Sequence, residues 1–94
     1  MLFVNIKGKD TAIIFRHHKQ VVQHKEAKQT HPFKTTCSIM TSKENCVASG
    51  EATVSPEDNF NYESGRTISL TRAMNNAGFD KATRSMVWDA YRNR

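Results

Sequence analysis

The chain has 94 residues, of which 37% are hydrophobic and 9% aromatic, enough apolar surface for one small domain with little to spare. A formal net charge of +5 and a pI of about 9.5 favour anionic partners such as nucleic acid, nucleotides or acidic protein surfaces. No apolar run approaches the ~18 residues that cross a membrane, and no secretory signal pattern is visible, so we expect no membrane association.

The first half of the chain predicts an antiparallel sheet. Alternating apolar residues predict strands at 2–6 and 11–18 with a tight turn between them. Residues 35–41 and 46–54 are rich in threonine and valine and predict a second hairpin. Residues 19–34 are polar and lack a sustained period, so we expect a long, mobile connection there, either functional or serving as an oligomer arm.

The two cysteines, Cys37 and Cys46, both fall in the second predicted hairpin. With residues 42–45 as its turn, Cys37 lies opposite Gly50 and Thr41 lies opposite Cys46. The sulfur atoms are then too far apart in register for a disulfide bond. We therefore expect two reduced, partly buried thiols in a cytosolic protein.

The second half of the chain predicts helices. Ser55 and Pro56 fit a helix N-cap and first helical position, and the turn they start is expected to break near residues 62–65. The next helix is expected from about residue 65 to 77, with Gly78 as its stop, and the last one over residues 81–92. Asp80 is the expected cap of the last helix. The apolar stripes predicted to face the core are Leu70, Ala73, Met74 and Ala77 in one helix, and Thr83, Met86, Val87, Ala90 and Tyr91 in the other.

This order of elements predicts a fold class. Strands followed by helices indicate a single α+β domain over residues 1–94. An antiparallel sheet of about four strands occupies about residues 1–54, and two C-terminal helices, within about residues 55–94, pack on one face of it. Partner chains are expected to supply part of the buried surface of so small a domain.

One helix face carries residues suited to bind an anion. Arg66, Ser69, Arg72 and Asn76 are three or four residues apart and are expected to point away from the apolar stripe. Guanidinium groups bind phosphate as bidentate forks, and the first turn of a helix favours negative charge. The alternative is a solvated polar face, or an ion pair of Arg72 with Asp58 or Glu63.

Other candidate residues each have two interpretations. Lys81, Arg84, Trp88 and Arg92 align along the last helix. The ring of Trp88 either covers a base or another subunit, or it covers the edge of the core beneath the arginine stems. Phe60 and Tyr62 either contact a nucleotide base beside the arginine face or fill the core.

The four histidines lack the spacing of a metal site, and no nucleophile motif, Walker loop or His-Glu-x-x-His motif is present. The sequence therefore predicts a binding protein without metal, cofactor or catalytic activity.

A segment covering residues 46–78 resembles a pattern of small bacterial and phage proteins, in which Gly-x-Ala precedes Pro-x-Asp, an aromatic residue, a glycine and a helix ending in Arg-Ala-Leu. The matching residues here are Gly50, Ala52, Ser55, Pro56, Asp58, Phe60, Gly65, Arg66, Ile68, Leu70, Arg72, Ala73 and Met74. One branch is a mycobacterial family of unknown function whose fold is similar to double-stranded RNA-binding domains. The other comprises the phage Thoeris anti-defence proteins of the first type, which sequester cyclic ADP-ribose-type signals, some also holding the cyclic oligonucleotides of related immunity.

The resemblance to the anti-defence branch implies a cyclic nucleotide ligand held between protomers, in dimers or hexamers, in the cytoplasm of an infected bacterium. It implies that Phe60, Asn61, Arg66 and Arg72 approach the nucleotide; Ser69, Arg84 and Trp88 complete the set of candidate ligand-binding residues. Two other functions remain open, a nucleic-acid-binding module of double-stranded RNA-binding type and a protein inhibitor of a host defence enzyme.

Overall fold

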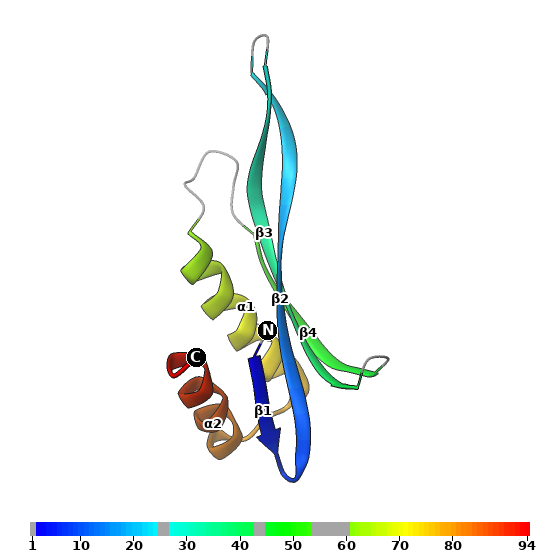
Figure 1. Ribbon diagram of the computed structural model, residues 1–94, viewed down its shortest axis with the longest axis vertical. Helices are drawn as coiled ribbons and strands as arrows, with labels where there is room; N and C mark the ends of the chain where they lie inside the picture. Colours follow the sequence, from blue (N-terminus) through cyan, green and yellow to red (C-terminus); the bar gives the residue numbers. More distant parts are fainter. Residues whose placement is uncertain (1, 25–26, 43–44, 54–60) are drawn as a thin grey trace.

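The computed structural model describes residues 2–24, 27–42, 45–53 and 61–94. In chain order the elements are β1 (Leu2–Ile6), β2 (Lys9–His24), β3 (Ala27–Ser42), β4 (Asn45–Thr53), α1 (Tyr62–Ala77) and α2 (Lys81–Arg92). The strands form one antiparallel sheet in the order β1-β2-β3-β4, and both helices cover the same face of it (Figure 1). The predicted α+β class, with a four-stranded sheet followed by two helices, is confirmed.

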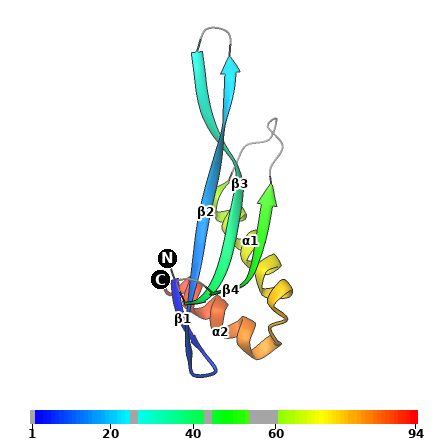
Figure 2. The same cartoon turned by 90° about the vertical axis from the view of Figure 1, so that its right-hand side faces the viewer.

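The hairpin of β2 and β3 is longer than the sequence predicted. The two strands stay paired as far as His24 and Ala27, with one register shift between His18 and Lys19. The expected mobile connection at 19–34 is therefore wrong: its described residues belong to strands. This half of the hairpin extends beyond both helices and the other strands (Figures 1 and 2). None of the described helices or other strands covers it there, so the alternating apolar residues that would have revealed strands in the sequence are not required.

The register of the second hairpin is partly as predicted. Cys37 pairs with Gly50, as expected, but the register shifts at Met40, which pairs with Cys46 in place of Thr41. Both cysteines are free thiols, and Cys37 is buried whereas Cys46 is exposed. Burial, with a smaller contribution from Cys46, raises the pKa of the Cys37 thiol to about 12. Cys37 therefore behaves as a protonated core residue.

Helix α1 begins earlier than expected. It starts at Tyr62, and the side chain of Asn61 caps it by accepting a hydrogen bond from the Ser64 N–H at 3.2 Å. Gly65, the expected start, lies buried inside the helix. An asparagine cap satisfies one of the free N–H groups of the first turn, which explains the earlier start. The predicted cap at Ser55 falls outside the described residues.

The other helix boundaries agree with the prediction. Gly78 ends α1 in the left-handed region at φ 70°, and Asp80 caps α2 by accepting a hydrogen bond from the Thr83 N–H at 2.8 Å. Hydrogen bonds from Thr83 hold the pKa of Asp80 below its ordinary value. Met86 was expected to face the core, but it is 45% exposed, because the buried face of α2 is narrow. The buried members of the two predicted stripes are Leu70, Ala73, Met74, Thr83, Val87 and Tyr91.

The core lies between the helices and the inner face of the sheet, which changes from bulky to small side chains along its length. Leu2, Ile13 and Ile39 are in register across β1, β2 and β3 and are buried. Along β4, Gly50 and Ala52 take the positions that face the helices. Small residues on β4 let α1 come close to that strand.

Gly50 sets the approach of α1 to β4. A Cβ atom at this position would lie 2.3 Å from the backbone nitrogen of Ala73 and 2.5 Å from the carbonyl oxygen of Ser69. Ser69 is completely buried in this contact, and its hydroxyl donates a hydrogen bond to the Arg66 carbonyl at 3.1 Å. The expectation that Ser69 points outward with the arginines is therefore wrong.

Candidate functional site

A cup opens on the helix side of the sheet, between β2, α1 and the residues that end α2. Its volume is about 380 Å³, and it is lined by Leu2, Phe15, His17, Arg66 and Arg94. Ile13 on β2 pairs with Leu2 on β1. Phe15 and His17 are the next two residues of β2 on the same inner face. The floor of the cup is therefore formed by strands, and its charged wall is formed by Arg66 on α1 and by Arg94, which follows α2.

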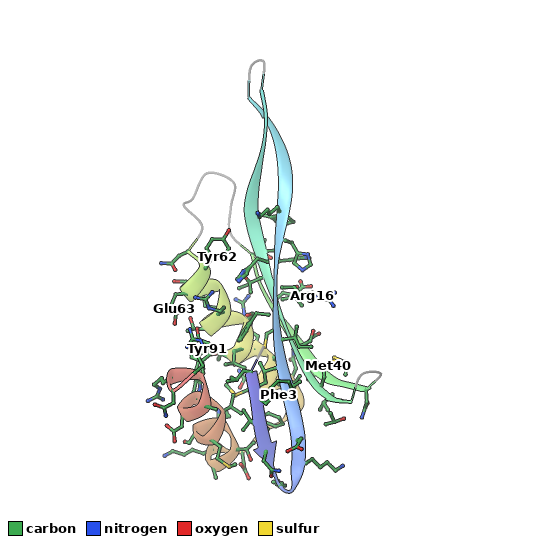
Figure 3. All side chains as sticks on the ribbon, in the orientation of Figure 1. Phe3, Arg16, Met40, Tyr62, Glu63 and Tyr91 are labelled. Carbon is green, nitrogen blue, oxygen red and sulfur yellow. The ribbon has the colours of Figure 1, made fainter. Side chains whose placement is uncertain are left out.

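A polar cluster ties the two helices together at the wall of the cup. The Glu63 carboxylate accepts hydrogen bonds from the Arg66 guanidinium and from the Tyr91 hydroxyl, each at 2.9 Å. A second guanidinium nitrogen, that of Arg94, lies 3.6 Å from the same carboxylate. The Arg66 Nε–H also donates to the Tyr91 hydroxyl at 3.4 Å. Figure 3 shows Glu63 and Tyr91 on the helix side of the sheet.

Tyr91 is the fixed centre of this cluster. It is only 3% exposed, and its ring meets those of Phe15 and Trp88 edge to face, with centroids 6.0 and 5.7 Å apart. The Arg94 guanidinium lies 3.9 Å from the Tyr91 ring centroid, in cation–π contact. Trp88 is half-buried against the core, in agreement with the second of its two interpretations. Packing around Tyr91 thus holds the charged groups in place.

The described side chains of the cup together carry one net positive charge at neutral pH. Hydrogen bonds from Arg66 and then Tyr91 lower the pKa of the Glu63 carboxyl, and the bond to Glu63 raises the pKa of Arg66. Burial, followed by the charges of Arg66 and His18, lowers the pKa of His17, so its imidazole is neutral. Arg66 and Arg94 supply two cations and Glu63 one anion, leaving one positive charge.

His17 is oriented from two sides. Its Nδ1 is 2.8 Å from the Thr35 hydroxyl on β3, and its ring packs edge to face on Tyr62 with centroids 4.6 Å apart. Tyr62 is 42% exposed, so it does not fill the core. An imidazole and a partly exposed phenol therefore stand beside the charged wall.

Acid is expected to weaken the Glu63 bridge between the helices. Because the pKa of Glu63 is lowered in the folded state, its stabilising contribution is present above the ordinary value of 4.5 and is lost as the pH falls through the folded-state pKa. Thermal unfolding of the natural chain and of Glu63→Gln, followed from pH 7 downward, checks this. We expect a higher Tm for the natural chain at pH 7 and a difference that shrinks below pH 4.5. A constant difference would contradict this role for Glu63.

Arg72 and Asn76, which were predicted to share a phosphate-binding face with Arg66, cover the edge of the sheet. The Arg72 guanidinium donates to the Glu51 carbonyl at 2.6 Å, and the Asn76 amide donates to the Ser49 carbonyl at 2.7 Å. β4 is an edge strand, so these bonds satisfy carbonyl groups that no neighbouring strand pairs.

The structure does not bring Arg66 and Arg72 to one pocket. Arg72 lines a separate hollow of about 210 Å³ with Thr67, Ile68 and Thr71. Six residues along an α-helix turn through roughly 600°, so the two side chains leave α1 about 120° apart. Arg66 faces α2 and the cup, whereas Arg72 faces the β4 edge.

The other predicted site residues that the structure describes do not line the cup. Phe60 is outside the described residues, and the Asn61 side chain is engaged as the cap of α1. Arg84 is exposed on α2 and does not line the cup. Among the predicted site residues that the structure describes, Arg66 is thus the one that lines this cavity.

Sequence reasoning missed most of the residues that make the cup. Glu63 was considered as a partner of Arg72, but it pairs with Arg66, and the i, i+3 spacing was a usable signal for that pair. Tyr91 was assigned to the core, which is correct for its ring, while its hydroxyl reaches Glu63 28 residues earlier in the chain. No local pattern predicts that contact or the position of Arg94.

The part of the chain described by the structure shows no group of three or more His, Cys, Asp or Glu side chains able to hold a metal ion. No helix within it is long and apolar enough to span a membrane.

No protein-family model matches the chain, and comparison with curated proteins and with solved structures finds no significant similarity. The fold and the cup by themselves define an α+β protein with a two-helix layer on an antiparallel sheet and a cationic, partly aromatic cavity where the layers meet.

Proposed function

We propose that this chain binds a small phosphate-bearing nucleotide in the cup and holds it without cleaving it. The observation that carries the proposal is the pair of guanidinium groups, Arg66 and Arg94, lining a cavity of about 380 Å³ beside the ring of Phe15. Guanidinium groups bind phosphate through paired hydrogen bonds, and aromatic rings contact bases. The volume lies within the range of small-molecule sites.

The titratable groups of the cup favour binding of the nucleotide without cleaving it. The Glu63 carboxylate already accepts hydrogen bonds from Arg66 and Tyr91, and its lowered pKa makes it a weak general base. The Nδ1 atom of His17 is 2.8 Å from the Thr35 hydroxyl and is engaged there. These contacts suit a preformed binding wall.

The resemblance of residues 46–78 to phage Thoeris anti-defence proteins supports a narrower form of the proposal. In this form the ligand is a cyclic ADP-ribose isomer or a cyclic oligonucleotide, and the protein removes this immune signal from the cytoplasm of the infected bacterium. Arg66, which belongs to the resembling segment, also lines the cup.

The proposal includes assembly with further copies of the same chain through the uncovered face of the sheet. Phe3 is 68% exposed on this face and lies in the same row of paired residues as Met40. Arg16 and Glu51 lie in another row, on strands that flank β3, so two copies related by a two-fold axis can place unlike charges opposite one another. Figure 3 shows Arg16 and Met40 on the side away from the helices.

Two measurements test the function. Native mass spectrometry of protein purified from signal-producing cells is expected to show an oligomer with a nucleotide mass retained on it. Calorimetry against cyclic ADP-ribose isomers, cyclic dinucleotides and cyclic trinucleotides is expected to identify the ligand. Folded protein that gives no heat with any of these nucleotides would remove the proposal. Length-dependent binding of duplex RNA with a steep salt dependence would favour a nucleic-acid-binding module instead.

A further inference from the structure

We propose that Glu63 makes the cup selective for phosphodiesters over phosphomonoesters. The inference rests on the proposed function, because it concerns the same cavity, and it narrows the ligand to one chemical class. It favours cyclic oligonucleotides, whose phosphodiester groups carry one charge each, over cyclic ADP-ribose isomers, whose pyrophosphate carries two adjacent charges. A phosphodiester carries one negative charge at neutral pH, whereas a terminal phosphomonoester carries about 1.5 to 2. The number of charges that the wall can neutralise therefore decides between the two.

The wall offers two guanidinium groups that share one carboxylate. Glu63 Oε2 lies 2.9 Å from a nitrogen of Arg66 and 3.6 Å from a nitrogen of Arg94, and Glu63 Oε1 accepts the Tyr91 hydroxyl. On the β2 side the titratable group is His17, which is neutral. The wall thus has one positive charge left for a ligand, which matches a phosphodiester.

The same carboxylate opposes a second negative charge. A phosphate that reaches both guanidinium groups necessarily comes close to Glu63, since the carboxylate contacts both of them. The extra charge of a phosphomonoester meets repulsion there, and the described residues that line the cup offer no further cation to offset it. A phosphodiester avoids most of this repulsion.

The guanidinium groups remain accessible while Glu63 is in place. The side chains of Arg66 and Arg94 are 28% and 43% exposed. Arg66 donates to the cluster through Nε and Nη2, and a guanidinium carries five N–H groups, so the others are available to an incoming phosphate. Glu63 therefore tunes the charge of the site without filling it.

Calorimetry with two mononucleotides that differ at the phosphate tests the inference. The probes are 3′,5′-cyclic AMP, a phosphodiester, and 5′-AMP, a phosphomonoester, with the natural chain, Glu63→Gln and Asp89→Asn. Oε2 of Glu63 accepts the hydrogen bond from Arg66 and Oε1 accepts the one from Tyr91, so glutamine keeps one of these two acceptors while removing the charge. Asp89 is exposed on α2 and does not line the cup, so Asp89→Asn removes one negative charge elsewhere and provides a matched control.

We expect the natural chain to bind cyclic AMP about tenfold more tightly than 5′-AMP. In Glu63→Gln we expect tighter binding of 5′-AMP, which reduces this preference about tenfold. Asp89→Asn is expected to keep the preference. If the ratio of the two dissociation constants is the same in Glu63→Gln as in the natural chain, the proposed role of Glu63 in selectivity is wrong, whereas the proposed nucleotide binding still stands. If Glu63→Gln does not fold, equal affinities of the natural chain for the two probes would overturn it. Binding of neither probe would also overturn it, and the wider nucleotide panel then decides the proposed function separately.

Discussion

Replacing Gly50 with alanine is expected to destabilise the protein more than any other single-methyl addition on β4. The new Cβ would lie 2.3, 2.5 and 2.8 Å from backbone atoms of Ala73, Ser69 and Arg72. Backbone of a packed helix cannot rotate aside as a flexible side chain can, so α1 must move away from β4. Overpacking usually costs about 1–3 kcal/mol, and a contact with helix backbone places this variant at about 3 kcal/mol or more. For so small a domain this is a large part of the free energy of unfolding.

Urea unfolding of Gly50→Ala beside Ser49→Ala measures this effect. Ser49 is the preceding residue on β4 and its side chain is exposed, so its replacement is expected to change the free energy of unfolding by less than about 0.5 kcal/mol. Equal midpoints for the two variants would show that α1 does not depend on close contact at Gly50. The small residues Gly50 and Ala52 thus have a packing role beneath α1.

Replacing Arg66 with glutamine is expected to weaken nucleotide binding about tenfold to a hundredfold. The change removes charge-assisted hydrogen bonds to phosphate, each worth about 1.5–3 kcal/mol. It also leaves Glu63 with only the more distant Arg94 as a cationic partner, 3.6 Å away, and brings the net charge of the wall to zero. Both effects oppose a phosphate in the cup.

Arg84→Gln is the matched control for Arg66→Gln. It removes the same formal charge from the chain, but Arg84 is exposed on α2 and does not line the cup. Calorimetry with the ligand found in the nucleotide panel is expected to give an almost natural Kd for Arg84→Gln. Equal weakening in both variants would mean that the overall positive charge attracts the nucleotide and that the cup does not bind it.

The structure also changes how the two helix arginines are interpreted. Arg66 and Arg72 were expected to act together on one phosphate, but they leave α1 in different directions. Arg72 instead bonds to the Glu51 carbonyl at the edge of the sheet. The helical spacing correctly placed both on polar positions of α1, yet it could not tell which neighbour each would meet, since β4 and α2 pack on different sides of the helix.

The long hairpin shows a second limit of sequence reasoning. Hydrophobic alternation predicts a strand only where one face of the strand is buried. The part of β2 and β3 that extends beyond the helices is not covered by any other described helix or strand, and its strand character comes from pairing between the two strands of the hairpin. Such pairing joins residues of two different strands, so it leaves no hydrophobic period within either segment of the sequence.

The sequence by itself determined the elements and several of their ends: strands before helices, the Cys37 and Gly50 register, and the stops and caps at Gly78 and Asp80. These features depend on periodicity and on capping chemistry within a few residues. Only the tertiary structure decided which side chains meet at the cup, where Tyr91 reaches Arg66 across 25 residues and Glu63 across 28. Such contacts depend on the angle and distance at which α1 and α2 pack on the sheet, and those follow from the shapes of buried residues drawn from every part of the chain.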